Sequence, residues 1–225
     1  MQLRGHYLQQ LNSIHTELLA LGQIVVSQAT GTIEALVQRD RSRAVQLIAN
    51  DGGVNRACDA IQQHIISCIA TQQPVASDLR RLLAALDIST ELERIADYAK
   101  NIAKLTIQSV LPPQGSANVL FTDLTRRTTQ TLSTALLALA QHDTIVARST
   151  ELLEAAVDTE AAAVRGQLLG LLHADPVAAD WSVNHLFSVY MLERIADRAT
   201  NIAERVIFMV SGETARLNEA PPKAV

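Results

Sequence analysis

Residues 91–104 read ELERIADYAKNIAK, and residues 191–204 read MLERIADRATNIAE. Ten of the fourteen positions agree at a constant offset of 100 residues, which is far more agreement than chance produces in a chain of 225 residues. Self-similarity at a fixed spacing is the sequence signature of a repeated structural unit. The two stretches therefore predict that the chain contains two copies of one unit.

The repeat extends upstream of both stretches. Residues 74–78 (PVASD) match residues 176–180 (PVAAD) at an offset of 102, and Asp40 matches Asp143. Between the copies, residues 109–116 (SVLPPQGS) combine two prolines with a glycine, which is typical of a linker. We therefore divide the chain into a first three-helix bundle at 1–110, a linker at 111–116, a second three-helix bundle at 117–213 and a polar tail at 214–225.

Apolar residues recur with the 3.6-residue period of amphipathic helices, and the prolines mark helix ends because a proline in a helix interior costs about 3 kcal/mol. The fold class is predicted to be all-α, as tandem three-helix bundles. Six long helices are expected at 4–38, 41–72, 74–108, 117–141, 143–173 and 176–211. The sequence Asp51-Gly52-Gly53 leaves open whether the second helix is kinked or interrupted by a turn.

The composition excludes several classes of protein. Hydrophobic residues make up 48% of the chain, which is too many for a disordered chain, and aromatic residues make up only 3%, which argues against an all-β fold. The net charge of −4 and the lack of a basic stripe argue against nucleic-acid binding. Two cysteines do not form a disulfide scaffold, and the N-terminal residues lack the apolar core of a secretory signal. A soluble cytoplasmic protein is expected.

Acidic residues recur on one face of the third helix in each copy. Glu93 and Asp97 are four residues apart, as are Glu193 and Asp197, so each pair lies on one side of its helix. Carboxylates at this spacing repel each other by a few tenths of a kcal/mol. Either a neighbouring arginine (Arg94 or Arg194) or a bound cation could offset the repulsion.

The second helix of each copy carries a related pair: Asp51 with Asn55, and Glu154 with Asp158. Neighbouring helices of a three-helix bundle run antiparallel, so one pair can face the other. A set made only of oxygen ligands favours hard cations such as Mg²⁺, Mn²⁺, Ca²⁺ or iron over a tetrahedral structural zinc. The residues thus predict a metal site in each bundle.

Two other interpretations of the acidic faces stay open. A helical interaction protein without metal would carry them as solvated surface. A carboxylate-bridged di-metal oxidase would need a Glu-x-x-His step on its helices, and no Glu in the chain is followed by His three residues later. The chain also lacks a phosphate-cradling glycine-rich loop and a GxSxG motif, so we expect it not to be an enzyme.

The repeated motifs resemble those of the PhoU family, whose members are accessory regulators of bacterial phosphate-specific transport. The resemblance rests on LERIADYAKNIA, on LERIADRATNIAERVIFMVSGE and on QQPVASDLR ahead of the first copy. It extends to the Arg39-Asp40 step and covers nearly the whole chain. It implies two three-helix bundles that hold multinuclear metal clusters, with iron, manganese, magnesium or zinc as the metal.

On this resemblance the metal ligands fall on eight residues. The second-bundle set is Glu154, Asp158, Glu193 and Asp197, all of which match the family pattern. The first-bundle set is Asp51, Asn55, Glu93 and Asp97, with Asn55 in place of an acid.

The resemblance also implies a role and partners. Such proteins act as cytoplasmic adaptors between the ATPase subunit of the phosphate ABC transporter and the sensor histidine kinase of the phosphate regulon. They restrain signalling when phosphate is plentiful. A homodimer, contact with the membrane only through partners and no binding to nucleic acid are expected.

Overall fold

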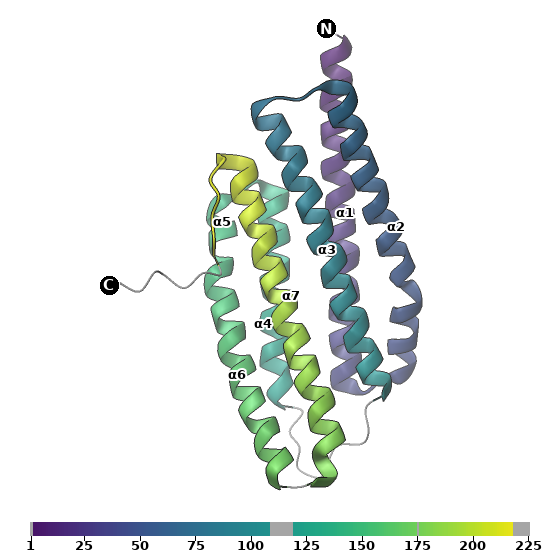
Figure 1. Cartoon of the computed structure of the whole chain (residues 1–225), viewed down its shortest axis with the longest axis vertical. Helices are drawn as coiled ribbons and strands as arrows, with labels where there is room; N and C mark the ends of the chain where they lie inside the picture. Colours follow the sequence, from purple (N-terminus) through teal and green to yellow (C-terminus); the bar gives the residue numbers. More distant parts are fainter. Residues whose placement is uncertain (1, 109–118, 175, 218–225) are drawn as a thin grey trace, which may run out of the picture.

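The structure, a computed structural model, describes residues 2–108, 119–174 and 176–217, and these ranges contain only helices and their connections (Figure 1). The predicted all-α class is confirmed. The helices are α1 (Gln2–Gln38), α2 (Arg41–Gln72), α3 (Ala76–Gln108), α4 (Val119–Gln141), α5 (Thr144–Arg148), α6 (Thr150–Ala174), the 3₁₀ turn η1 (Pro176–Ala178) and α7 (Ala179–Ser211).

The helices form two groups that lie side by side. Helices α1, α2 and α3 pack on one another, as do α4, α6 and α7, while the short α5 lies against α4 and α7 (Figure 1). The groups meet through α3 against α7 and α1 against α4. Gly22 on α1 allows the second of these approaches, because a Cβ at this position would come within 2.9 Å of the Leu136 side chain on α4.

The repeated stretches form the inner faces of α3 and α7. Ile95, Ala99 and Ile102 are fully buried, as the periodicity predicted. Ile195 and Ile202 hold the matching places on α7 and are also buried. Burial of these apolar faces is the main favourable term holding each group together, and it leaves the polar faces of the same helices free for other roles.

The two matching aspartates act as helix caps. Asp40 accepts a hydrogen bond from the backbone N–H of Arg43 at 2.9 Å and so caps α2. Asp143 accepts from the N–H groups of Ile145 and Val146 and caps α5. Each aspartate accepts hydrogen bonds from backbone N–H groups that have no partner within the first helical turn. This capping role gives a physical reason for an aspartate at the matching position of both repeats.

The predicted fifth helix is wrong in one respect: it is divided into α5 and α6 by a turn at Ser149. The Ser149 hydroxyl donates to the carbonyl of Val146 and the Thr150 hydroxyl donates to that of Ala147, each at 2.7 Å. The backbone at Ser149 stays in the right-handed helical region, so α6 continues from α5 after a single turn residue. Gly52 and Gly53, in contrast, lie inside an uninterrupted α2.

Two helix starts also differ from the expectation. The third helix begins at Ala76 instead of Pro74, and residues 176–178 form η1 ahead of α7. Ala76 has a φ of 49°, a left-handed conformation, so regular helical backbone does not extend back to Pro74. Pro176 is the first residue of η1, a position that tolerates proline because the first helical turn needs no N–H partner. At the other end of α7, Gly212 has a φ of 79° and donates its N–H to the carbonyl of Phe208, which ends the helix.

The predicted linker at 111–116 lies outside the described residues. The start of the predicted polar tail does not extend freely: Ala215 and Leu217 are buried, and the Leu217 N–H donates to the Glu204 carboxylate at 2.6 Å. The boundaries at 110, 117 and 213 stay predictions. Within the described ranges, no helix has the length and apolar character needed to cross a membrane.

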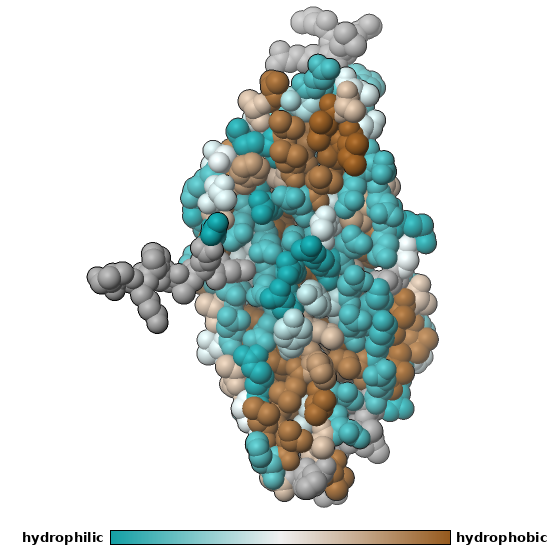
Figure 2. Space-filling model, in the orientation of Figure 1, coloured by the Kyte–Doolittle hydropathy of each residue, from teal (hydrophilic) through white to brown (hydrophobic). Residues whose placement is uncertain are grey.

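Polar side chains join the two groups of helices at α3 and α7. Glu91 accepts hydrogen bonds from Arg198 at 3.4 Å and from Asn201 at 3.3 Å, and Asp87 pairs with Arg205 at 3.3 Å. On the face that α3 and α7 present, hydrophilic residues form a band across the middle, while apolar residues gather near both ends (Figure 2). These polar contacts set the register in which the two halves meet.

Candidate metal centre

Three carboxylates converge between α6 and α7. Glu154 and Asp158 lie one turn apart on α6, and Asp197 faces them from α7. One oxygen of each lies within 4.8 Å of the others, a spacing that lets a single cation contact all three. We call Glu154, Asp158 and Asp197 the carboxylate cluster. The structure thus brings together three of the four residues predicted for the second-bundle site.

The fourth predicted residue has another partner. Glu193 forms an ion pair with Arg165 of α6, and its side chain is largely shielded from solvent. The sequence interpretation missed Arg165, although a signal existed: Arg165 lies seven residues after Asp158, two turns further along the same face of the helix. Glu193 therefore lies beside the cluster as an acid already paired with a cation.

A second arginine pairs with the cluster itself. Arg194 donates to the Asp197 carboxylate at 2.6 Å, which is the arginine compensation that the sequence left open. In the first copy, the matching Arg94 instead pairs with Glu91 at 3.2 Å. When all groups are ionised, four carboxylates face two guanidinium groups, so the second site keeps an excess of two negative charges.

The pKa values of the three cluster carboxylates are raised, chiefly by burial and in part by the charge of neighbouring carboxylates. Burial, followed by the charges of Asp158, Asp197 and Glu151, raises the pKa of Glu154 to about 7. The pKa values of Asp158 and Asp197 are also raised, in both cases chiefly by burial. Glu154 and Asp197 are partly buried and Asp158 is exposed, and carboxylates with raised pKa values gain from a cation placed between them. A hard cation fits this donor set, and Glu154, Asp158 and Asp197 would hold it.

The first-bundle residues are arranged differently. Glu93 accepts from the thiol of Cys58 at 3.5 Å, and burial together with the Glu93 charge raises the pKa of that thiol to about 11. Asp97 pairs with Lys100 at 2.7 Å and is about half exposed. Asn55 is exposed on α2 one turn before Cys58, and the side chain of Asp51 lies outside the described part of the structure. The expected four-residue set in this bundle therefore stays a prediction.

The remaining polar residues of the repeated face serve other contacts. Asn101 accepts from Lys104 at 3.4 Å, whereas Asn201 donates to Glu91 across the boundary between the halves. The matching positions of the two repeats thus have different partners. The two helices carry the same polar residues on this face, but these residues form hydrogen bonds and ion pairs with different partners.

Comparison with known proteins places this architecture in a family. The family model described as PhoU domain matches twice, at residues 18–106 and 121–206. Over 210 residues the chain is 33% identical to a protein of Xylella fastidiosa (strain Temecula1 / ATCC 700964) named phosphate-specific transport system accessory protein PhoU homolog. That match covers 92% of this chain and 86% of the relative.

Two solved structures share the fold along nearly their whole length. The crystal structure of PhoU from Pseudomonas aeruginosa has a TM-score of 0.87 at 30% identity and covers 92% of this chain and 100% of that one. The crystal structure of the phosphate transport system regulatory protein PhoU from Streptococcus pneumoniae has a TM-score of 0.86 at 26% identity. It covers 93% of this chain and 99% of that one.

Proposed function

The chain belongs to the PhoU family, and on that premise we propose that it is an accessory regulator of phosphate transport in the cytoplasm. The observation that carries the proposal is the match to both PhoU domains together with relatives of similar length that are named transport accessory proteins. A regulatory role needs contact with partners and no turnover of a substrate. We therefore propose that the protein is an adaptor and not an enzyme.

The partners that we propose are the ATPase subunit of the phosphate ABC transporter and the sensor histidine kinase of the phosphate regulon. By binding both, the protein would restrain kinase signalling while phosphate is plentiful. Support for partner binding comes from α7, where Val183, Phe187 and Tyr190 are exposed at positions that share one face of the helix. Exposed aromatic residues on one helix face are typical of interaction surfaces.

A homodimer would use the same kind of surface. Leu83 is also exposed on the first half of α3, and apolar surface gathers near both ends of the face in Figure 2. A two-fold dimer brings the same surface of each subunit together. Sedimentation equilibrium over micromolar concentrations tests this part of the proposal, and a monomer throughout would contradict it.

We propose that a hard cation binds the carboxylate cluster and stiffens the contact between α6 and α7. The support is the donor set: three carboxylate oxygens within 4.8 Å, raised pKa values and no nitrogen or sulfur ligand in the cluster. Iron, manganese, magnesium and zinc are the candidates, and the oxygen donors favour the harder ions. Metal analysis of protein purified without chelator tests occupancy.

Deletion of the gene is the decisive test of the regulatory role. In phosphate-rich medium, the deletion strain should express a phosphate-regulon reporter at a raised level, because a restraint on the kinase is lost. Reintroducing the parent gene should restore repression. Unchanged reporter expression in the deletion strain would remove the regulatory proposal while leaving the fold and the metal site intact.

A further inference from the structure

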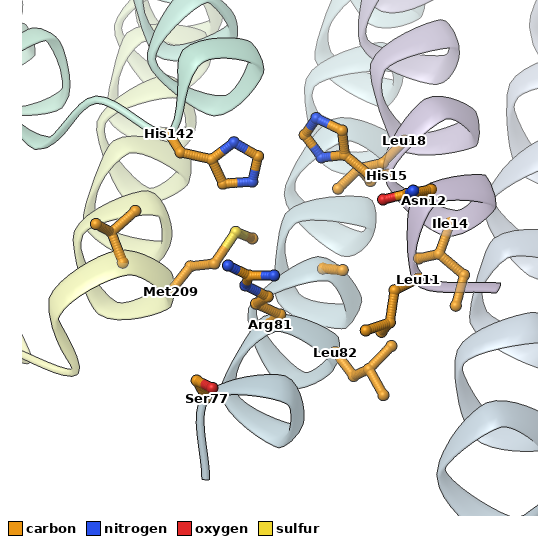
Figure 3. A pocket seen from close by; sticks show the side chains of 12 residues that line it. Leu11, Asn12, Ile14, His15, Leu18, Ser77, Arg81, Leu82, His142 and Met209 are labelled. Atoms are coloured by element: carbon orange, nitrogen blue, oxygen red, sulfur yellow. The ribbon is translucent and has the colours of Figure 1, made fainter. Parts of the chain in front are cut away.

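A cavity of about 250 Å³ opens between the two halves of the molecule, at a distance from the carboxylate cluster. Met209, which lines it, lies twelve residues beyond Asp197 on α7, or about 18 Å along the helix axis. Residues of α1, α3, α7 and the end of α4 surround it (Figure 3). The cavity is therefore a separate feature that both halves build.

Three basic side chains meet at this cavity. The rings of His15 on α1 and His142 after α4 face each other with centroids 4.7 Å apart, and Arg81 of α3 extends beside them (Figure 3). None of the described residues that line the cavity is acidic. Asp78, one turn before Arg81 on α3, is not among the lining residues. The cavity thus gathers one guanidinium and two protonatable imidazoles without a neutralising carboxylate among its described lining residues.

Two further polar groups complete the wall. Ser77 and Asn12 line the cavity with a hydroxyl and an amide, each of which can donate a hydrogen bond. Arginine presents a fork of N–H donors that matches the oxygens of phosphate, and protonated histidine donates from both ring nitrogens. The cavity volume is several times the volume of about 30 Å³ that one water molecule occupies in the liquid, so an ion with four oxygens fits.

We propose that this cavity binds a small tetrahedral oxyanion of the phosphate type, either inorganic phosphate or the phosphate group of a small monoester. Arg81 holds the anion, and His15 on α1 and His142 in the turn after α4 donate hydrogen bonds to it. Because its ligands come from both halves, the bound anion bridges the two bundles. The anion site stands whether or not the chain regulates phosphate transport, so the two proposals fail separately.

The histidine pair makes the site sensitive to pH. Burial, with the charge of His142 and then of Arg81, lowers the pKa of His15, and burial with Arg81 lowers that of His142. The free cavity therefore holds its imidazoles mostly neutral near neutral pH. An anion favours their protonated forms, so its affinity must rise as the pH falls. The lining residues of α7, Met209 and Val210, add no titratable group.

Calorimetric titration of the full chain with inorganic phosphate, in low salt with EDTA present, tests the site. Saturable binding is expected, and Arg81→Gln should weaken it about tenfold or more, because the charged hydrogen bonds to the anion are lost. The control is Arg126→Gln, which makes the same change of charge at an exposed residue of α4 and should leave the affinity unchanged. Equal affinity in Arg81→Gln and the parent, or no saturable binding to the parent, would overturn the proposal.

The pH dependence is measured with sulfate, which stays doubly charged from about pH 8 to about pH 6 while the imidazoles titrate. Sulfate should bind more tightly at the lower pH, and His142→Asn should reduce this gain. Asparagine is chosen because it tolerates the left-handed backbone, with φ of 51°, at this position. A flat profile in the parent protein would contradict the role of the histidines.

Two further arms identify the source and location of the anion. Phenyl phosphate that binds as tightly as inorganic phosphate would indicate a monoester ligand, whereas much weaker binding would indicate the free ion. Phosphate titration without EDTA then compares the parent protein with Arg81→Gln. Phosphate binding that requires metal and persists in Arg81→Gln would assign the ion to a metal cluster and refute the cavity site. Circular dichroism of each variant verifies that its helices remain folded.

Discussion

Arg165 of α6 forms an ion pair with Glu193 of α7, immediately beside the carboxylate cluster. The pair holds the Arg165 guanidinium close to Asp158. Burial and the charge of Glu193 raise the pKa of Asp158, and Arg165 offsets part of that rise. A guanidinium at this place therefore competes with any metal cation for the same carboxylates. It also occupies the Glu193 carboxylate, which lies close enough to raise the pKa values of Asp158 and Asp197.

Removal of this arginine should strengthen metal binding. We predict that Arg165→Gln raises the affinity for Mn²⁺ about tenfold, because one positive charge leaves the site and Glu193 becomes available as a ligand. Titration calorimetry on chelator-stripped protein measures the change, with Arg126→Gln as the matched control. Weaker binding in Arg165→Gln would mean that the arginine orients Glu193 for the metal.

Removal of a cluster carboxylate should have the opposite effect. Asp197→Asn keeps the size of the side chain and removes a charge, so we predict about tenfold weaker metal binding at the second bundle. Asp123→Asn, at an exposed residue of α4, provides the control and should bind like the parent. If Asp197→Asn retains the affinity of the parent, the metal does not bind at the cluster.

Asn55 gives a test of the first bundle. We predict that Asn55→Asp increases metal occupancy there, since it adds the missing charge on the turn of α2 next to Glu93. At the second bundle, four carboxylates face two guanidinium groups, and at the first bundle the described carboxylates Glu93 and Asp97 face Lys100. The second bundle should still bind more tightly, because its carboxylates are already assembled. Metal stoichiometry after graded chelation compares the two bundles, and preferential loss from the second would contradict this order.

The metal-free protein should lose stability as the pH rises. The pKa of Glu154 is raised from its ordinary value of 4.5 to about 7. The folded state thus binds this proton more tightly than the unfolded state. Its stabilising effect is complete below pH 4.5 and disappears as the pH passes 7.

Urea denaturation with EDTA, repeated across this window, measures the effect. The free energy of unfolding should fall by on the order of 1 kcal/mol more in the parent than in Glu154→Gln, a value reduced for the partial exposure of the carboxyl. With saturating metal, the free energy of unfolding of the parent and of Glu154→Gln should depend on pH in the same way across this window. Parallel profiles for the two metal-free proteins would mean that Glu154 does not titrate in this range.

The contact between the halves should depend on Glu91. This carboxylate is 13% exposed and accepts from Arg94, Arg198 and Asn201. Glu91→Ala leaves those donors unpaired, so we predict a loss of about 1–3 kcal/mol in the free energy of unfolding. Glu34→Ala breaks a solvent-exposed pair with Arg43 and should cost less than about 1 kcal/mol. Equal losses in the two variants would show that Glu91 does not couple the halves.

The repeat, the all-α class and the buried faces of α3 and α7 could all be predicted from the order of the residues. This was possible because helix periodicity is local: residues such as Ile95 and Ile102 are placed on one face by their spacing alone. The same periodicity placed Glu154 and Asp158 on one face of α6, while the expectation that Asp197 faces them came from antiparallel helix packing and from the family resemblance. The repeat also identified Asp40 and Asp143 as matching positions, which the structure shows to be caps.

Only the tertiary structure decided which partners these side chains have. Arg165 meets Glu193, Cys58 meets Glu93, and His15 meets His142, at sequence separations from 28 to 127 residues. The turn at Ser149 likewise has no signal in the hydrophobic periodicity. Spacing along a helix fixes the direction of a side chain, but the rotation and depth at which two helices pack fix the distance between side chains on different helices. That packing results from burial of the whole core, so no short stretch of sequence reveals it.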